Sequence, residues 1–304
     1  MKKNSITITY LSKVSFASLN GADKEVDNIN PIKKVTLSNG EELPYVSSQA
    51  IRRALRDRLK EMEWKLSPIN EASASKGVPK TTCNPREYID DDLLGYMDAQ
   101  KGKEGAQGTS KTRTSPIRVE SLLALSSYKG DLDFGTNYMG KGLKDSKGKD
   151  IQPNIFETEI HSGFYRGSIL IELDRVGKNE GFENGEELSS EEKAKRVIAF
   201  IDAFQNLWSS GRQSRFLADI SPKFIAAAYM KAKNPIFLEA VNVGENNNIN
   251  INQLLTVKED YKNYIEESIF AAQNSIFPKN DNYTNLYEGF TKIQSWIKNY
   301  YNVK

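Results

Sequence analysis

The sequence predicts an α+β fold of ferredoxin-like type that is split by insertions. Three observations predict it. Residues 5–18 alternate apolar and polar side chains as a half-buried strand does, residues 189–208 repeat apolar side chains at helical spacing, and periodicity disappears between about residues 70 and 115. The coarse order is strand, helix, strand and then strand, helix, strand. That order suits a ferredoxin-like sheet whose connections carry the insertions.

The first elements follow from local patterns. Residues 5–18 predict a central strand with Ile6, Ile8 and Tyr10 on one face. A polar loop at 20–31 comes next. Residues 33–46 then predict a hairpin whose tight turn is supplied by the Ser-Asn-Gly run at 38–40.

A helix follows directly, in the segment PYVSSQAIRRALRDRL at 44–59. Ser47 or Ser48 is a good N-cap, and we expect the first-turn N–H groups to remain open to an anion. One face would anchor the helix to the core through Ile51, Leu55 and Leu59. A second face would turn outward, and it holds Gln49, Arg52, Arg56 and Lys60. The pattern predicts a helix that binds phosphate.

The rest of the chain alternates between insertions and ordered elements. Ser115 and Pro116 form an N-cap and N1 pair and predict a short helix within 115–133. Gly and Lys then recur up to residue 153, and strand alternation resumes, which predicts a long hairpin reaching away from the body. Residues 189–208 predict an amphipathic helix that begins with a capping box-like run. At least one strand is expected in 211–241, and helices are expected at 257–277 and 286–301.

Composition narrows the function classes. Lys and Arg total 42 against 40 Asp and Glu, so a basic site must be local. The single cysteine, Cys83, excludes an internal disulfide framework and fits a reducing compartment. The single histidine, His161, leaves little material for a Ser-His-Asp triad or a histidine-rich metal centre. The N-terminus predicts a strand and not a signal peptide, and no segment is long enough to cross a membrane. We expect a cytoplasmic protein.

Four segments in order resemble the DevR-type backbone subunits of CRISPR Cascade complexes, found in type I-B systems. They are SLNGADKEVDNINPIKKV at 18–35, the helix segment at 44–59, TSPIRV at 114–119 and GRQSRF at 211–216. Such proteins have an RNA-recognition-like (RRM-like) palm with a finger insertion and a thumb hairpin. The resemblance implies residues 1–59 as the first half of the palm, 60–114 as the inserted fingers, 115–133 as a palm helix, 134–162 as the thumb hairpin and 163–304 as the second half of the palm with the C-terminal helices.

The resemblance also implies a function: a non-catalytic subunit that oligomerises along the CRISPR RNA and presents it for pairing with target DNA. The implied RNA-binding residues are Asn20, Ser47, Ser48, Gln49, Arg52, Arg53, Arg56, Arg212 and Gln213. The candidates for a wedge between bases are Tyr138, Met139, Ile155 and Phe156. The implied partners are further copies of the chain, the cap, large and small subunits and, indirectly, a helicase-nuclease. No cofactor, metal or catalytic residue is expected.

Alternatives stay open for each site. Taken alone, the basic face of the helix at 44–59 is also explained as a solvent-exposed surface whose arginines pair with Asp57 and Glu61. Residues 211–215 are also explained as a turn that leaves the long helix, with Phe216 and Leu217 in the core. Phe164 and Tyr165 either stack on RNA bases or pack within the protein. Asp23 or Asp27 would serve a type III-like endoribonuclease that cuts target RNA. A DNA-binding regulator is the other alternative function, although no helix-turn-helix is visible. His161 is expected to be structural.

Overall fold

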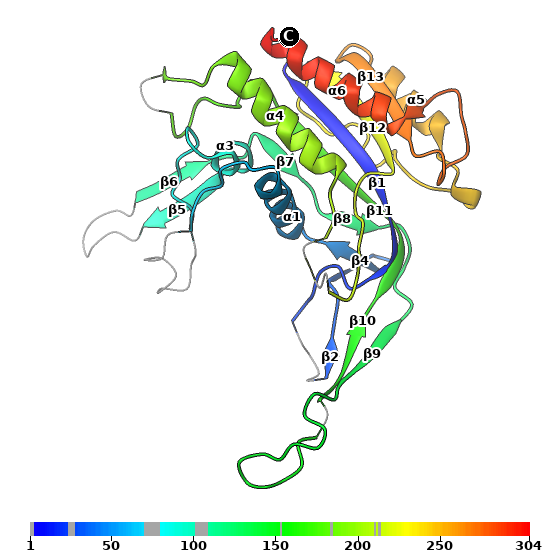
Figure 1. The fold of residues 1–304 in the computed structure, drawn as a ribbon. Coiled ribbons are helices and arrows are strands. Elements are labelled where there is room, and N and C mark those ends of the chain that lie inside the picture. Colours follow the sequence, from blue (N-terminus) through cyan, green and yellow to red (C-terminus); the bar gives the residue numbers. More distant parts are fainter. Residues whose placement is uncertain are drawn as a thin grey trace.

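The computed structural model describes residues 3–23, 28–69, 80–100, 109–152, 154–182, 185–209, 211 and 214–304. Within these residues a nine-stranded sheet forms the body, in the order β14-β13-β12-β1-β11-β8-β4-β3, with β7 also paired to β11 (Figure 1). Its strands are β1 (Ser5–Ala17), β3 (Lys34–Thr36), β4 (Glu42–Val46), β7 (Ile117–Val119), β8 (Leu122–Ala124), β11 (His161–Glu172), β12 (Phe224–Met230), β13 (Ile265–Ala272) and β14 (Thr284–Asn285). The predicted α+β organisation is confirmed.

Strand β1 lies at the centre, as predicted, between β11 and β12 and antiparallel to both. The expectation that it is half-buried is wrong, because residues 5–12 are buried on both faces. Ile6, Ile8 and Tyr10 belong to the larger hydrophobic core, whereas Leu11 points into a second core behind the sheet. A strand between two covered faces gains apolar contact on each side. Its buried polar residues are small, and the hydroxyls of Ser5, Thr9 and Ser12 are hydrogen-bonded, whereas that of Thr7 has no partner among the described residues.

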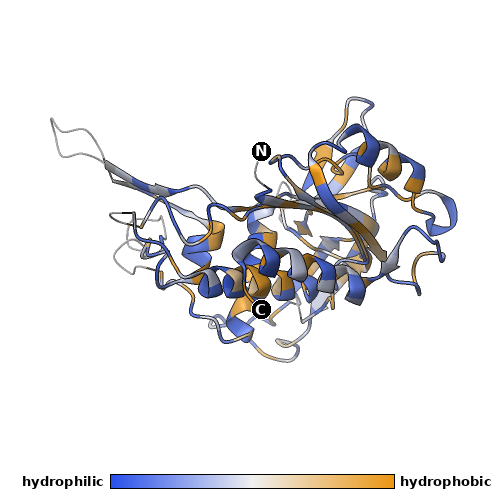
Figure 2. Cartoon of the chain, turned by 90° about the horizontal axis from the view of Figure 1, so that it is seen from above, coloured by the Kyte–Doolittle hydropathy of each residue, from blue (hydrophilic) through white to orange (hydrophobic). Residues whose placement is uncertain are grey.

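Helices cover the two faces unequally. The helices on the face of the larger core are α1 (Ser48–Glu61), α4 (Ser190–Gln205) and α6 (Leu286–Tyr301) (Figure 1). Helix α5 (Ile251–Asp260) contributes to the second core, and the 3₁₀ helix η2 (Glu245–Asn247) precedes it. Figure 2 shows the hydrophobic residues gathered in the helices and strands of this body.

Two arms leave the body. The first is the hairpin of β5 (Tyr96–Gln100) and β6 (Thr109–Arg113), which follows α3 (Ile89–Leu94), a buried helix whose apolar side chains pack in the larger core. Buried Asp92 holds its base, since its carboxylate pairs with Arg113 at 2.6 Å and with Arg196 of α4 at 2.9 Å. The second arm is the hairpin of β9 (Leu132–Asn137) and β10 (Asn154–Glu159), with β2 (Ile29–Asn30) parallel to β10. It projects from the lower end of the body in Figure 1, as the sequence predicts for a long hairpin.

Several local predictions are confirmed. Gly40 has a φ of +85°, and the Leu37 amide donates to the Glu41 carbonyl at 2.8 Å, which closes the predicted hairpin turn. Ser189 caps α4 by accepting from the Glu192 amide.

Two predicted helices are strands instead. The segment 115–133 forms β7 and β8, because pairing with β11 offers hydrogen bonds that no local pattern reveals. The segment 257–277 continues α5 only to Asp260 and then forms β13 along β12. In both cases tertiary pairing decides against local helix propensity.

Candidate nucleic-acid interface

The start of α1 is tied to the loop that follows β1. Ser47 is the N-cap, and its side chain accepts from the Ala50 amide at 3.3 Å, as the sequence predicts. The Ser47 amide donates to Oδ1 of Asn20 at 2.8 Å. Asn20 therefore fixes where the helix begins relative to the loop.

The first turn of α1 is less open to an anion than its sequence suggests. The Ser48 amide donates to Oγ of Ser121 at 3.2 Å, and the Ser48 hydroxyl donates to the Val119 carbonyl at 2.6 Å. The prediction that these N–H groups stay free is wrong for Ser48, because the β7–β8 turn occupies the position where an anion would bind. Gln49, which is exposed, keeps its side chain available on this turn.

Arg52 and Arg56 are only partly exposed, and both bond within the protein. The Arg52 guanidinium donates to the Leu94 carbonyl, and burial, with a further contribution from Arg56, lowers the pKa of Arg52 to about 10. Arg56 pairs with Asp90 at 3.2 Å, and Asp90 is only 2% exposed. The predicted outward face is therefore wrong for both arginines. They bind α3 of the inserted segment to α1, and an RNA contact by either stays a prediction.

The exposed basic residues of α1 are Arg53, which directly follows Arg52, and Lys60. The Arg53 side chain is 70% exposed and pairs with Asp57, one turn later, at 3.1 Å. Gln49, Arg53 and Lys60 share one face at helical spacing, and all three are exposed. This is the face of α1 that a ligand can reach.

Arg53 borders a groove of about 260 Å³ in which separate segments meet. It is lined by the loop after β1, by α1 and by the segment after α4: Ser18, Leu19, Asn20, Gly21, Val46, Ala50, Arg53, Ala54, Ser209, Gly211 and Ile220. Arg53 is the one charged side chain among these lining residues. A groove with amides, hydroxyls and one guanidinium suits a phosphate group.

The segment after α4 approaches this groove closely. A Cβ added at Gly211 would lie 3.2 Å from the Leu19 carbonyl oxygen, so a larger residue would require a small shift of the loop after β1. The structure thus brings Gly211 of the GRQSRF segment beside the groove at Arg53. Arg212 and Gln213 themselves lie outside the described residues, and their contact with RNA stays a prediction. Phe216 is buried as expected, whereas Leu217 is 85% exposed and is not a core residue.

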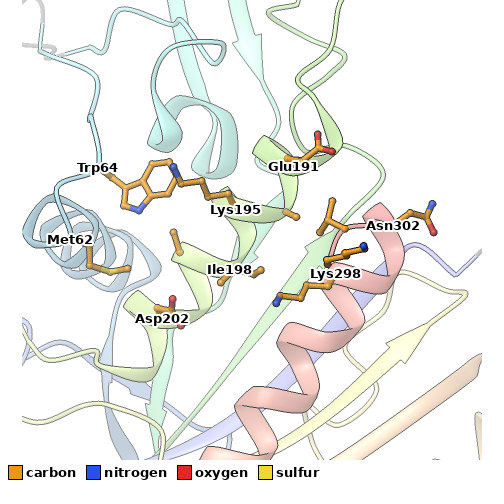
Figure 3. Close-up of a pocket in the computed structure, with 12 residues that line it drawn as sticks. Met62, Trp64, Glu191, Lys195, Ile198, Asp202, Lys298 and Asn302 are labelled. Carbon is orange, nitrogen blue, oxygen red and sulfur yellow. The ribbon is translucent and has the colours of Figure 1, made fainter.

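A larger cavity of about 600 Å³ lies at the other end of α1, between α4 and α6 (Figure 3). Lys195 lies over the Trp64 ring at 5.3 Å, and Lys298 also lines the cavity. Two acids share it. Burial raises the pKa of Asp202, although the Gln294 amide donates to that carboxylate, and Glu191 also lines the cavity. This mixed charge is less suited to phosphate than the groove at Arg53.

The second arm presents apolar side chains. Tyr138 and Met139, where β9 ends, are 56% and 88% exposed, and Ile155 on β10 is also exposed. Phe156 differs, because its ring lies against Gly135 and carries the Arg215 guanidinium at 5.1 Å. Three of the four wedge candidates are therefore accessible to a ligand, and insertion between bases stays a prediction.

Asp23 lines a separate pocket of about 370 Å³ with Glu42 and Glu159. Lys34 reduces the negative charge there, since it lies 2.9 Å from Glu159 and 3.7 Å from Glu42. Asp27 lies outside the described residues. Among the described residues no group of three or more His, Cys, Asp or Glu side chains could hold a metal ion.

His161 and its neighbours pack inside the protein. Nδ1 of His161 lies 2.8 Å from the Tyr165 hydroxyl, and burial lowers the pKa of His161. Tyr165 is buried, and Phe164 packs against Phe277 with ring centroids 5.6 Å apart. Their geometry fits packing, which was one of the two alternatives for these aromatics.

Known proteins resemble the chain in sequence and in fold. The family model described as "CRISPR-associated negative auto-regulator DevR/Csa2" matches residues 8–250. The chain belongs to this family. A CRISPR-associated protein Cas7/Cst2/DevR of Myxococcus xanthus (strain DK1622) is 28% identical over 221 residues, which cover 70% of this chain and 68% of that protein.

Two solved structures share the fold of this DevR/Csa2 family member. A chain of a CRISPR RNA-guided surveillance complex, pre-nicking, superimposes with a TM-score of 0.61 at 12% identity, covering 96% of this chain and 100% of its own. A chain of a second CRISPR RNA-guided surveillance complex gives 0.56 at 15% identity, covering 96% and 99%. At these identities the likeness concerns the fold.

The family match includes the groove and both arms but ends as α5 begins. Sequence reasoning missed two residues near the site. Asp90 belongs to the acidic run at 87–92, whose charge is expected to repel phosphate. Ser121 lies in the segment 115–133, for which the sequence predicts a helix. Neither position carries a local signal for its contact with α1. Among the described residues, no helix has the length and apolar character to span a membrane.

Proposed function

We propose that this protein is a non-catalytic, CRISPR RNA-binding backbone subunit of a type I-B Cascade, which oligomerises along the guide and presents it for pairing with target DNA. The observation that carries the proposal is the groove at Arg53. It joins the loop after β1, α1 and the segment after α4, and its one charged lining residue is a cation. Membership of the DevR/Csa2 family supports the same function.

The fold supports an RRM-like, ferredoxin-like palm with two additions. In this proposal the β1-centred sheet with α1, α4 and α6 is the palm. Residues 60–114, with α3 and the β5–β6 hairpin, are the fingers, and residues 134–162, in the β9–β10 arm, are the thumb. An arm that projects from the body can reach a neighbouring copy or the guide, which a compact domain cannot.

The proposed RNA contacts fall into three groups. Gln49 and Arg53 contact the guide from the exposed face of α1, and Asn20 lines the groove beside them. Ser47, Ser48, Arg52 and Arg56 act mainly by shaping this surface, since their polar groups already bond within the protein. Arg212 and Gln213 extend the contact from the segment after α4. Base pairing supplies the sequence specificity, so contacts to base edges are few.

The proposed partners are the guide RNA, target DNA through the guide, further copies of this chain, the cap, large and small subunits and, indirectly, a helicase-nuclease. Both similar structures are chains of CRISPR RNA-guided surveillance complexes, which supports partners of this kind.

A direct test compares binding to single-stranded RNA, single-stranded DNA and duplex DNA at several salt concentrations. We expect preference for single-stranded RNA without sequence preference, and weakening with salt because phosphate contacts dominate. Preference for duplex DNA of one sequence would instead support a DNA-binding regulator, an alternative favoured by the auto-regulator wording of the family description.

A second alternative is a type III-like endoribonuclease centred on Asp23. The observation in its favour is that Asp23 shares a pocket with Glu42 and Glu159. It predicts metal-dependent cutting of RNA complementary to the guide, lost in Asp23→Ala. In our proposal the assembled complex leaves that RNA intact, and Asp23→Ala changes nothing.

A further inference from the structure

Arg215 joins the loop after α4 to the β9–β10 arm. Its guanidinium pairs with Asp133 of β9 and lies 3.3 Å from the Thr158 hydroxyl of β10. The same group lies 5.1 Å from the Phe156 ring centroid and 5.3 Å from the Phe216 ring centroid. We call Arg215, Asp133, Phe156 and Phe216 the clasp. A planar guanidinium can pair with a carboxylate and stack on aromatic rings at the same time, for which the compact ammonium of a lysine is less suited.

The arm has few other ties to the body in the described residues. Strand β2 pairs with β10 over only two residues. At the base of the arm, Glu159 accepts from the Ile32 amide at 2.9 Å and pairs with Lys34. These contacts hold β10 near its end, whereas β9 is the outer strand, beyond β10 and β2. Among the described strands β9 pairs only with β10, along its whole length, so the ion pair to Asp133 braces this edge strand from the side.

On the side of the body, the clasp is anchored in the larger hydrophobic core through Phe216. Phe216 is buried, and its ring packs edge-to-face on Phe16 at 5.7 Å. Four residues before Arg215, Gly211 lines the groove at Arg53. Gly211 thus lies at the proposed RNA groove, Arg215 contacts the arm and Phe216 lies in the core.

We propose that Arg215 is a positioning residue that fixes the angle of the β9–β10 arm and couples it to the groove. A nucleic acid that binds at Gly211 restrains Arg215, four residues further along the chain, and through Asp133 it stiffens the arm. The coupling rests on the proposed RNA-binding function. The bracing of the arm does not.

Spin-label distance measurements on the full chain test both parts. One label goes on Asn154→Cys, at the start of β10, and the other on Lys258→Cys, an exposed position of α5, in a Cys83→Ser background. Without RNA, we expect Arg215→Gln to broaden the distance distribution roughly twofold, because the outer strand loses its brace. Arg215→Lys, which keeps the charge but not the stacking, should fall between wild type and Arg215→Gln. Arg86→Gln, which removes an exposed arginine paired with Glu186, is the matched control and should leave the distribution unchanged.

The RNA arm of the experiment separates the two parts. Adding unstructured single-stranded RNA should narrow the wild-type distribution and leave Arg215→Gln broad. An RNA-free Arg215→Gln distribution equal to wild type overturns the brace. If the wild type binds RNA but its distribution does not narrow, the coupling is wrong. If the wild type does not bind RNA, the proposed function and the coupling both fail, while the RNA-free result still decides the brace. A wild-type circular dichroism spectrum for Arg215→Gln ensures that unfolding is not what is measured.

Discussion

Two arginines three residues apart on α1 should have separable effects when each is replaced by glutamine. Arg53 is exposed and lines the groove, whereas Arg56 pairs with buried Asp90. We therefore expect Arg53→Gln to weaken RNA binding with little loss of stability, and Arg56→Gln to reduce stability. The sequence alone predicts that Arg56 faces outward, whereas the structure pairs it with buried Asp90. Comparing the two variants therefore distinguishes between these two placements of Arg56.

The magnitudes follow from the contacts. Losing one partly exposed guanidinium–phosphate contact costs about 1–1.5 kcal/mol, or roughly tenfold in Kd, and lowers the slope of log Kd against log salt by about 0.7 for a single strand. The Arg53–Asp57 pair is exposed and contributes only about 0.3–0.5 kcal/mol to folding. In Arg56→Gln, Asp90 keeps the Ser67 amide as a donor at 2.9 Å but loses its cation, which costs about 1–3 kcal/mol of unfolding free energy.

The assay is fluorescence anisotropy with a labelled, unstructured RNA at several salt concentrations, together with urea unfolding of the same preparations. Lys262→Gln is the control, because Lys262 is an exposed lysine paired within its own segment and lies away from the groove lining. The reasoning is refuted if Arg53→Gln leaves both the affinity and the salt slope unchanged. It is refuted equally if Arg56→Gln unfolds at the wild-type urea concentration.

Three further outcomes are expected. Asp92→Asn should cost about 3–5 kcal/mol in urea unfolding, because buried Arg113 and Arg196 lose their shared carboxylate; a loss under 1 kcal/mol would contradict that role. Burial lowers the pKa of His161 below the unfolded value of about 6.5, so the unfolded chain binds the proton first. The free energy of unfolding should be at its full value above about pH 6.5 and should fall as the pH drops from there through the folded pKa of His161. His161→Gln should flatten this pH dependence. Met139→Ser should leave unfolding unchanged because the side chain is exposed, yet lower the fluorescence of 2-aminopurine in bound RNA if this residue unstacks bases; unchanged fluorescence argues against Met139 as the wedge.

Structural features that depend on residues close together in the chain could be predicted from the sequence. The turn at Gly40 and the caps at Ser47 and Ser189 each depend on residues within a few positions, and all three form as expected. The apolar face of α1 also lies where its spacing indicates, with Ile51, Leu55 and Leu59 buried.

Features that depend on distant partners could not be predicted. The segment after Pro116 carries a helix-start signal but pairs with β11, because an open strand edge satisfies its backbone better than an isolated helix can. The same holds for β13 beside β12. Arginines beside a cap indicate an anion site, yet the anion that Arg56 meets is Asp90, thirty-four positions further along the chain.

Local patterns in the chain were enough to predict the family resemblance, the α+β class, the central strand and the helix that carries the basic residues. Which arginine of that helix faces a ligand depends on contacts between segments that are distant in the chain. The physical reason is that helical spacing fixes which side chains share a face, whereas the neighbours of that face come from insertions that fold back from elsewhere in the chain. Asp90 neutralises Arg56 in this way, and the loop at Gly211 brings a groove to Arg53.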